Sequence, residues 1–180
     1  MARRNDVRVI KTRQKLRRAL LLVLGEKRIE DLSITEVCSA AGVNRNTFYA
    51  HYSDLYELLD EVKSSYLEYF SKELSECRKK SDGTEDMLTY FLKLIDKSRF
   101  FFSIIFSDES FPVFMHSLVQ ISLEETFISI NADNADISDT CIFITGGVSN
   151  MIDSWLRSSG QITVEEEAGK IRALIEKLHS

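Results

Sequence analysis

Five side chains between residues 45 and 51 could bind a nucleic acid: Arg45, Asn46, Thr47, Tyr49 and His51. Guanidinium, amide, hydroxyl, phenol and imidazole groups all donate hydrogen bonds, and DNA offers acceptors on its phosphates and base edges. Phe48 and Tyr52 lie four residues apart in the same stretch and therefore share one face of a helix. The spacing predicts a helix over 45–51 with an apolar back and a donor-rich front.

The residues before this helix predict the element that must hold it in place. Val37 and Ala41 share one face of a short helix, and Gly42 follows at the point where that helix must end. Glycine accepts the positive φ that a sharp turn requires. Asn44 is a good N-cap for a helix that begins at Arg45. Two short helices joined by such a turn form the helix-turn-helix that enters a DNA major groove.

The motif AAGVNRNTFYAHY, followed by SDLYELL, resembles the signature of TetR-type transcriptional regulators. A predicted helix over 9–25 agrees with the resemblance, because Leu16, Leu20 and Val23 fall on one face. Together the resemblance covers roughly residues 10 to 60. One position departs from the family, which usually carries a phosphate-contacting lysine where this chain has Leu55. The resemblance therefore does not imply a contact between residue 55 and a DNA phosphate.

The resemblance implies a DNA-binding regulator, a repressor that binds a palindromic operator as a homodimer and is released by a small apolar effector. Arg45, Asn46 and Thr47 would then approach base edges and phosphates. Tyr49 and His51 would hydrogen-bond phosphates, and the basic arm with Arg3 and Arg4 would add minor-groove or backbone contacts. Phe48 and Tyr52 would anchor the helix over 45–51, which we call the reading helix, to the first and fourth helices.

Charge is divided unevenly along the chain. Residues 1–54 hold 11 Lys or Arg and 6 Asp or Glu, whereas residues 55–180 hold 12 and 22, so the net charges are +5 and −10. A basic head on an acidic body indicates a protein that touches nucleic acid with one end. The alternative is that the basic residues only solvate the first helix. The cluster in question comprises Arg3, Arg4, Arg8, Lys11, Arg13, Lys15, Arg17 and Arg18.

Few residues interrupt the helical periodicity, since the chain has one proline and seven glycines in 180 residues. The sequence therefore predicts an all-α fold with a helix-turn-helix domain at 1–54 and a helical ligand-binding and dimerisation domain at 55–180. Capping patterns place helix starts at Ser33, Asp54, Thr84 and Thr163, and a loop is expected over 131–138. The expected long helices are 54–79, 85–98, 110–130, 138–159 and 163–177.

The helix over 138–159 is apolar on all sides and contains two adjacent glycines, which cost about 1 kcal/mol each relative to alanine. Close approach of another helix would offset this cost. The TetR resemblance implies a dimer through the last two helices, and an internal core helix is the alternative. The predicted interface residues are Gly146, Gly147, Met151, Trp155, Ile171 and Leu174.

An aromatic run near the middle of the chain allows two interpretations. Its residues could line a pocket for a hydrophobic effector, or they could fill an ordinary core. The candidate pocket residues are Phe91, Phe101, Phe102, Phe106, Phe114 and Phe127. No polar cluster can be assigned to the head group of a ligand.

Other kinds of chemistry find little support. The three cysteines and three histidines have no metal-ligand spacing, and the sequence contains no nucleophile motif and no phosphate-binding loop. We therefore expect no cofactor, no metal, no enzymatic activity, no membrane span and a cytoplasmic location with reduced thiols. The rival function is a DNA-binding co-activator or assembly factor whose body binds a partner protein and no small molecule.

Overall fold

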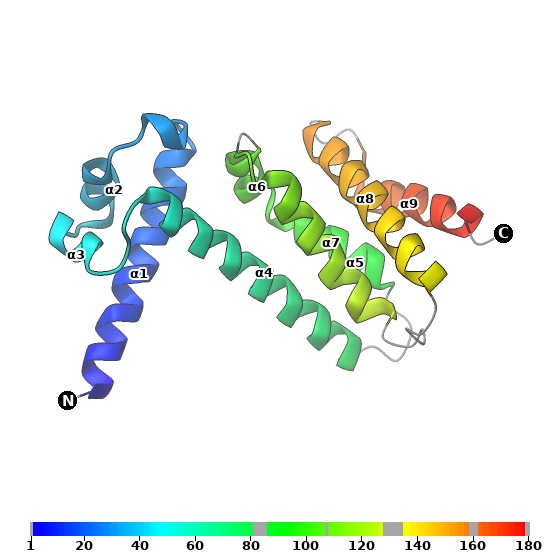
Figure 1. Cartoon of the computed structure of the whole chain (residues 1–180), viewed down its shortest axis with the longest axis horizontal. Coiled ribbons are helices and arrows are strands. Elements are labelled where there is room, and N and C mark those ends of the chain that lie inside the picture. Colours follow the sequence, from blue (N-terminus) through cyan, green and yellow to red (C-terminus); the bar gives the residue numbers. More distant parts are fainter. Residues whose placement is uncertain (1, 81–85, 107, 128–134, 159–161, 179–180) are drawn as a thin grey trace. The chain divides into compact units, whose positions relative to one another are not determined.

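The computed structural model describes residues 2–80, 86–106, 108–127, 135–158 and 162–178, and these residues form helices joined by short turns (Figure 1). No strand occurs within those ranges, so the predicted all-α fold is confirmed. A short 3₁₀ turn, Ile29–Asp31, lies between the first two helices. The α-helices are α1 (Ala2–Leu24), α2 (Ile34–Ala41), α3 (Arg45–Tyr49), α4 (Leu55–Lys80), α5 (Met87–Lys97), α6 (Arg99–Ile105), α7 (Phe111–Phe127), α8 (Ala135–Arg157) and α9 (Val164–Leu178).

The chain folds into two compact units. The first consists of Met1–Tyr66 with Ser103–Ser107, and the second of Leu67–Phe102 with Asp108–Ser180. Helix α4 contributes its first turns to the first unit and its remainder to the second. The functional division into residues 1–54 and 55–180 stays a proposal about what each part does.

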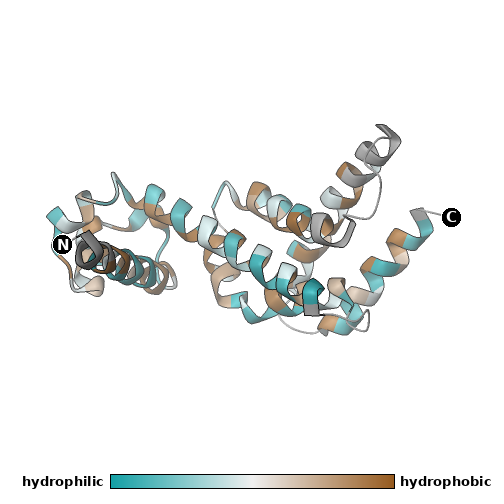
Figure 2. Cartoon of the chain, turned by 90° about the horizontal axis from the view of Figure 1, so that it is seen from below, coloured by the Kyte–Doolittle hydropathy of each residue, from teal (hydrophilic) through white to brown (hydrophobic). Residues whose placement is uncertain are grey.

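The core of the first unit is built from one face of each of its helices. Leu16 and Leu20 on α1, Phe48 on α3 and Leu58 on α4 are each 0% exposed. Figure 2 shows hydrophilic and hydrophobic residues alternating along the helices, as expected where one face is buried. Helix α1 begins at Ala2, earlier than the predicted residue 9. No proline or glycine lies between these two positions to interrupt the helix. The first turns lack the apolar period by which a helix is recognised in a sequence, so the sequence does not predict them.

Capping residues set most of the helix starts. In α2, Ser33 Oγ accepts from the Glu36 amide at 3.2 Å and the Glu36 carboxylate accepts from the Ser33 amide at 2.9 Å, which is a complete capping box. The box at Thr163 and Glu166 is also complete. Both were predicted from the sequence, and both are confirmed.

Two further helix starts differ from the sequence prediction. Helix α5 begins at Met87 because the Asp86 side chain accepts from the Thr89 amide, and the predicted cap, Thr84, lies outside the described residues. Helix α8 begins at Ala135, so the last four residues of the expected loop are helical. A polar first turn carries no apolar period, which is why this start was missed.

The second unit packs α7 against α8 and α5 against α9. Phe91, Leu92 and Ile95 on α5 are at most 1% exposed. An ion pair between Arg172 and Asp86 ties α9 to the start of α5. These contacts fix the last helix within the second unit.

Candidate functional site

The turn before α3 has the geometry that the sequence predicted. Gly42 adopts the left-handed conformation, with φ of 64° and ψ of 39°, and the Val43 amide donates to the Cys38 carbonyl at 3.0 Å. This arrangement satisfies carbonyls at the end of α2. Asn44 then caps α3, since its Oδ1 accepts from the Thr47 amide at 2.7 Å. Helices α2 and α3 therefore form a helix-turn-helix.

Helix α3 has a buried back and an exposed front. Phe48 is 0% exposed and Tyr52 is 3% exposed, with their ring centroids 5.7 Å apart. Arg45, Asn46 and Tyr49 are exposed, whereas Thr47 and His51 are half-buried. The predicted anchoring role of the two aromatic residues is confirmed, and the polar residues predicted to contact DNA lie together around the exposed side of α3.

Arg45 and Tyr49 hold each other on that exposed side. Arg45 Nη2 donates to Tyr49 Oη at 3.3 Å, and the guanidinium carbon lies 5.8 Å from the centre of the tyrosine ring. The hydrogen bond with this phenol raises the pKa of Arg45 further above its ordinary value. An arginine held over a ring loses less side-chain freedom when it binds a phosphate or a base.

Thr47 is also oriented before any ligand binds. Its Oγ1 donates to Asn44 Oδ1 at 2.9 Å, and the same oxygen of Asn44 caps the helix. The lone pairs of the Thr47 hydroxyl then remain for a donor such as a base amino group.

The basic cluster on α1 divides into two groups. Arg8, Lys11, Lys15 and Arg18 are exposed. Two other members of the cluster, Arg13 and Arg17, pair with Glu61 on α4. Part of the positive charge that the sequence assigned to DNA is thus already paired within the protein.

Two further sequence predictions concern the ends of this region. Arg3 and Arg4 lie in α1, but their side chains are outside the described part of the molecule. Leu55, which stands where related proteins usually have lysine, is 6% exposed and packs in the core. This buried apolar side chain does not provide the contact to a DNA phosphate that the lysine makes in related proteins.

Comparison with known proteins identifies the family. Residues 82–177, more than half of the chain, match a TetR family model described as a transcriptional regulator C-terminal region. The chain belongs to the TetR family of transcriptional regulators. The resemblance read from the N-terminal motif is confirmed by this independent match to the rest of the molecule.

Two solved structures share the TetR fold of this chain. A TetR transcriptional regulator from Streptococcus agalactiae 2603V superimposes with a TM-score of 0.72 at 18% identity, covering 97% of this chain and 99% of that one. The dihydroxyacetone kinase operon activator DhaS gives a TM-score of 0.62 at 15% identity, covering 93% and 95%. No curated protein matches the sequence significantly.

The predicted ligand-pocket residues of this TetR-family chain lie mostly in a packed aromatic cluster. Phe91, Phe101, Phe102 and Phe114 are at most 5% exposed. The ring centroids of Phe101 and Phe114 are 5.6 Å apart, and those of Phe101 and Phe102 are 5.5 Å apart. Phe106 is half-buried, and the side chain of Phe127 is outside the described residues. The rings contact one another, which is the geometry of a core, and the effector site stays a prediction.

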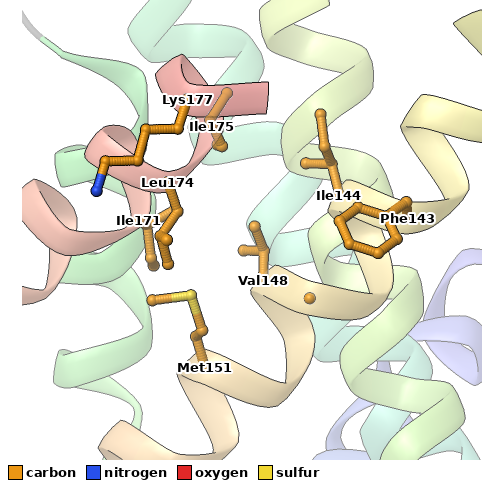
Figure 3. Close-up of a pocket in the computed structure, with 9 residues that line it drawn as sticks. Phe143, Ile144, Val148, Met151, Ile171, Leu174, Ile175 and Lys177 are labelled. Carbon is orange, nitrogen blue, oxygen red and sulfur yellow. The ribbon is translucent and has the colours of Figure 1, made fainter. Parts of the chain in front are cut away.

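An apolar pocket of about 340 Å³ lies between α8 and α9. Figure 3 shows side chains from the two helices pointing toward one another across it. Four predicted dimer residues line this pocket, namely Gly147, Met151, Ile171 and Leu174. Phe143, which the sequence-based list omitted, also lines it and is 66% exposed. Its exposure could not be read from a helix that is apolar on every face.

The two glycines of α8 have open space where a side chain would lie. A Cβ placed on Gly146 or Gly147 would meet no heavy atom within 4 Å. Trp155, in contrast, is 2% exposed, lies under the Arg99 guanidinium at 4.5 Å and donates from Nε1 to the Ile162 carbonyl at 3.0 Å. Trp155, which the sequence placed at the dimer interface, therefore packs inside its own chain. Both explanations for the two glycines stay predictions.

The described ranges contain no helix with both the length and the apolar run needed to cross a bilayer. Within the same ranges, no group of three or more His, Cys, Asp or Glu side chains is placed to hold a metal ion.

Proposed function

We propose that this TetR-family regulator binds duplex DNA sequence-specifically as a homodimer and reads the major groove with α3. The observation that carries the proposal is the row of donors on the exposed side of α3, whose opposite side is buried through Phe48. The TetR family membership supports the same function. A rigid helix with a donor-rich front can enter the major groove, where each base pair presents a distinct pattern of acceptors and donors.

The contacts divide by role. Arg45 and Thr47 approach base edges, while Tyr49 and His51 bind phosphates and set the register of the helix. The exposed lysines and arginines of α1 supply affinity that does not depend on sequence. Each good base contact discriminates by about 1–3 kcal/mol, so two such contacts on each protomer suffice for a specific operator.

The apolar face of α8 and α9 supports the homodimer. Ile142, Phe143 and Leu174 are 63%, 66% and 49% exposed, and the last two line the apolar pocket. A contiguous apolar patch of this kind marks a protein–protein interface more often than a bare surface. A two-fold axis through this face would pair it with itself and give the symmetric reader that a palindrome requires.

The same face supports a second candidate function, in which it binds a different protein and the molecule acts as a co-activator or assembly factor. The two candidates differ in the oligomeric state of the purified chain. The sign of regulation stays a prediction: a repressor is expected from the resemblance, and DhaS, a structural neighbour, is named as an activator. The apolar effector also stays a prediction.

Selection of bound sequences from random duplex DNA at a stated salt concentration tests the proposal. We expect a palindromic consensus and an affinity that falls steeply as salt rises. Thr47→Ala and Tyr49→Ala should weaken binding to the selected operator about tenfold or more, while circular dichroism and the oligomeric state remain unchanged. Absence of any selected sequence, or normal operator binding by both variants, would contradict the assignment of α3 as the reader.

A further inference from the structure

A single carboxylate on α4 accepts hydrogen bonds from two other parts of the first unit. Glu61 Oε2 accepts from Arg13 Nε at 3.0 Å and from Tyr52 Oη at 2.7 Å. The Nη2 of Arg13 also pairs with this oxygen. The second oxygen, Oε1, lies 3.6 Å from Arg17 Nε. We call Glu61, Tyr52, Arg13 and Arg17 the Glu61 cluster.

The Glu61 cluster joins α1 and α4 to Tyr52, which lies three residues after the end of α3 at Tyr49. Tyr52 lies four residues after Phe48, and its amide donates to the Phe48 carbonyl at 3.0 Å. The Tyr52 ring is 3% exposed and contacts the ring of Phe48. Tyr52 therefore links the Glu61 cluster to Phe48 on the buried side of α3. Burial raises the pKa of Tyr52 to about 12.

The negative charge of Glu61 is unexpected in a unit that we propose binds DNA. Glu61 places a negative charge beside two arginines of the basic cluster, in the unit that we propose binds a polyanion. A carboxylate there weakens the attraction to DNA. Phe48, Leu58 and Leu16 are each 0% exposed, so apolar burial on α3, α4 and α1 stabilises the first unit without Glu61. What the carboxylate adds is a fixed direction for the Tyr52 hydroxyl and for Arg13.

We propose that Glu61 is a positioning residue for operator recognition, which sets the orientation of α3 through Tyr52 and Arg13. The inference rests on the proposed function, because orientation of α3 matters only if α3 reads DNA. The sequence indicated that Arg13 and Arg17 contact phosphates of the DNA. The proposal instead gives both arginines a role in holding α3 in its orientation. Specificity then depends on a polar cluster that itself touches no base.

Two substitutions separate positioning from electrostatics. Glu61→Gln keeps the shape of the side chain and removes the charge, whereas Tyr52→Phe removes only the hydroxyl. The affinity for the selected operator and for an unrelated duplex would be measured at one salt concentration. We expect each variant to lose about tenfold in the ratio of the two affinities. Glu61→Gln should bind the unrelated duplex as well as the wild type or better, because the first unit becomes more positive.

The matched control is Asp60→Asn, which removes the same charge from the neighbouring residue of α4. Asp60 is 70% exposed and pairs with Lys63 at 2.8 Å, outside the Glu61 cluster. We expect Asp60→Asn to leave the affinity ratio unchanged. The double variant with Glu61→Gln and Tyr52→Phe should lose no more than either single variant, because residues that act as one unit are not additive. Circular dichroism and urea unfolding would establish that each variant is folded at the assay temperature.

Three outcomes decide between the explanations. If wild type selects an operator and both variants keep the wild-type affinity ratio, the positioning role is overturned while the proposed function stands. Equal gains in affinity for both duplexes with Glu61→Gln, and no effect of Tyr52→Phe, would assign Glu61 a purely electrostatic role and also overturn the proposal. A wild-type protein that binds no duplex would overturn the proposed function and this inference with it.

Discussion

At the scale of single residues, the polar side chains of α3 are held by neighbours a few positions away. Asn44 Oδ1 serves both the Thr47 amide and the Thr47 hydroxyl, and Tyr49 holds the guanidinium of Arg45. These local pairs follow from helical spacing and could be anticipated from the sequence. The pairing of Arg13 with Glu61 could not, because the two residues are 48 positions apart and only the folded helices bring them together.

Glu36 allows a prediction about the dependence of stability on pH. Its carboxylate accepts from Lys27 Nζ at 2.6 Å and from the amide and hydroxyl of Ser33, and these hydrogen bonds lower its pKa to about 2. A carboxylate with a lowered pKa stabilises the folded state above its unfolded pKa, about 4.3, and loses that contribution as the pH falls toward the folded value. Glu36→Gln should therefore unfold at lower urea than wild type at pH 7, with a gap that narrows between pH 5 and pH 3.

Urea unfolding followed by circular dichroism at pH 7, 5, 4 and 3 measures that gap. The control is Glu30→Gln, since Glu30 is 52% exposed and pairs with Arg28, which is 67% exposed. Exposed pairs contribute little to stability, so this variant should follow wild type at every pH. A gap for Glu36→Gln that stays constant down to pH 3 would show that the capping box does not depend on the charge of Glu36.

At the scale of elements, the turn between α2 and α3 depends on the backbone conformation of one residue. A Cβ on Gly42 would meet nothing within 4 Å, so Gly42→Ala meets no steric obstacle and suffers only from the positive φ. The left-handed conformation costs a residue with a Cβ about 1–2 kcal/mol, and we expect this loss in the free energy of unfolding. Gly169→Ala is the matched control, because Gly169 lies inside α9 with the same free space.

The control should change stability in the opposite direction, with a gain of about 0.5–1 kcal/mol from the higher helix propensity of alanine. Urea unfolding of both variants under identical conditions provides the comparison. Effects of the same sign at the two glycines would mean that the turn conformation is not what Gly42 contributes. Operator affinity of Gly42→Ala should also fall, because the turn sets where α3 begins.

Helix types and most helix starts were predictable because their signals are local. The capping residues Ser33, Asn44 and Thr163 each begin a helix where the sequence indicated. The start of α8 was missed because a polar first turn has no apolar period. The surfaces were harder to predict than the elements: Trp155 and Phe143 are both large and apolar, and only packing decides that the first is buried and the second is 66% exposed.

At the scale of the whole molecule, the division of charge and the apolar face make separate contributions. Residues 55–180 carry a net charge of −10, which repels DNA and favours approach through the residues before them, whose net charge is +5. The apolar face of α8 and α9 does not determine which end of the chain approaches DNA. A second copy of the chain can cover this face with its own α8 and α9. The proposed binding to a palindrome would require both properties, because each protomer would read half of the site.

The final prediction follows from this dependence. Phe143→Glu or Leu174→Glu would place a carboxylate on the exposed apolar face, and a two-fold interface would contain that change twice. Each unpaired charge buried in an interface costs about 3 kcal/mol or more, so the two copies together cost about 6 kcal/mol or more, equivalent to roughly a 10⁴-fold rise in the dimer Kd. Val113→Glu is the control, because Val113 is 69% exposed on α7 and does not line the pocket.

Sedimentation equilibrium measures the dimer Kd, and binding to full and half operators measures the consequence. We expect both interface variants to lose affinity for the palindrome while they bind a half-site as wild type does, because α3 and the turn before it are untouched. Val113→Glu should match wild type in both assays. A wild-type chain that sediments as a monomer would instead favour the second candidate function, in which this face binds a different protein. If wild type is a dimer and neither substitution changes the dimer Kd, the interface lies elsewhere on the chain.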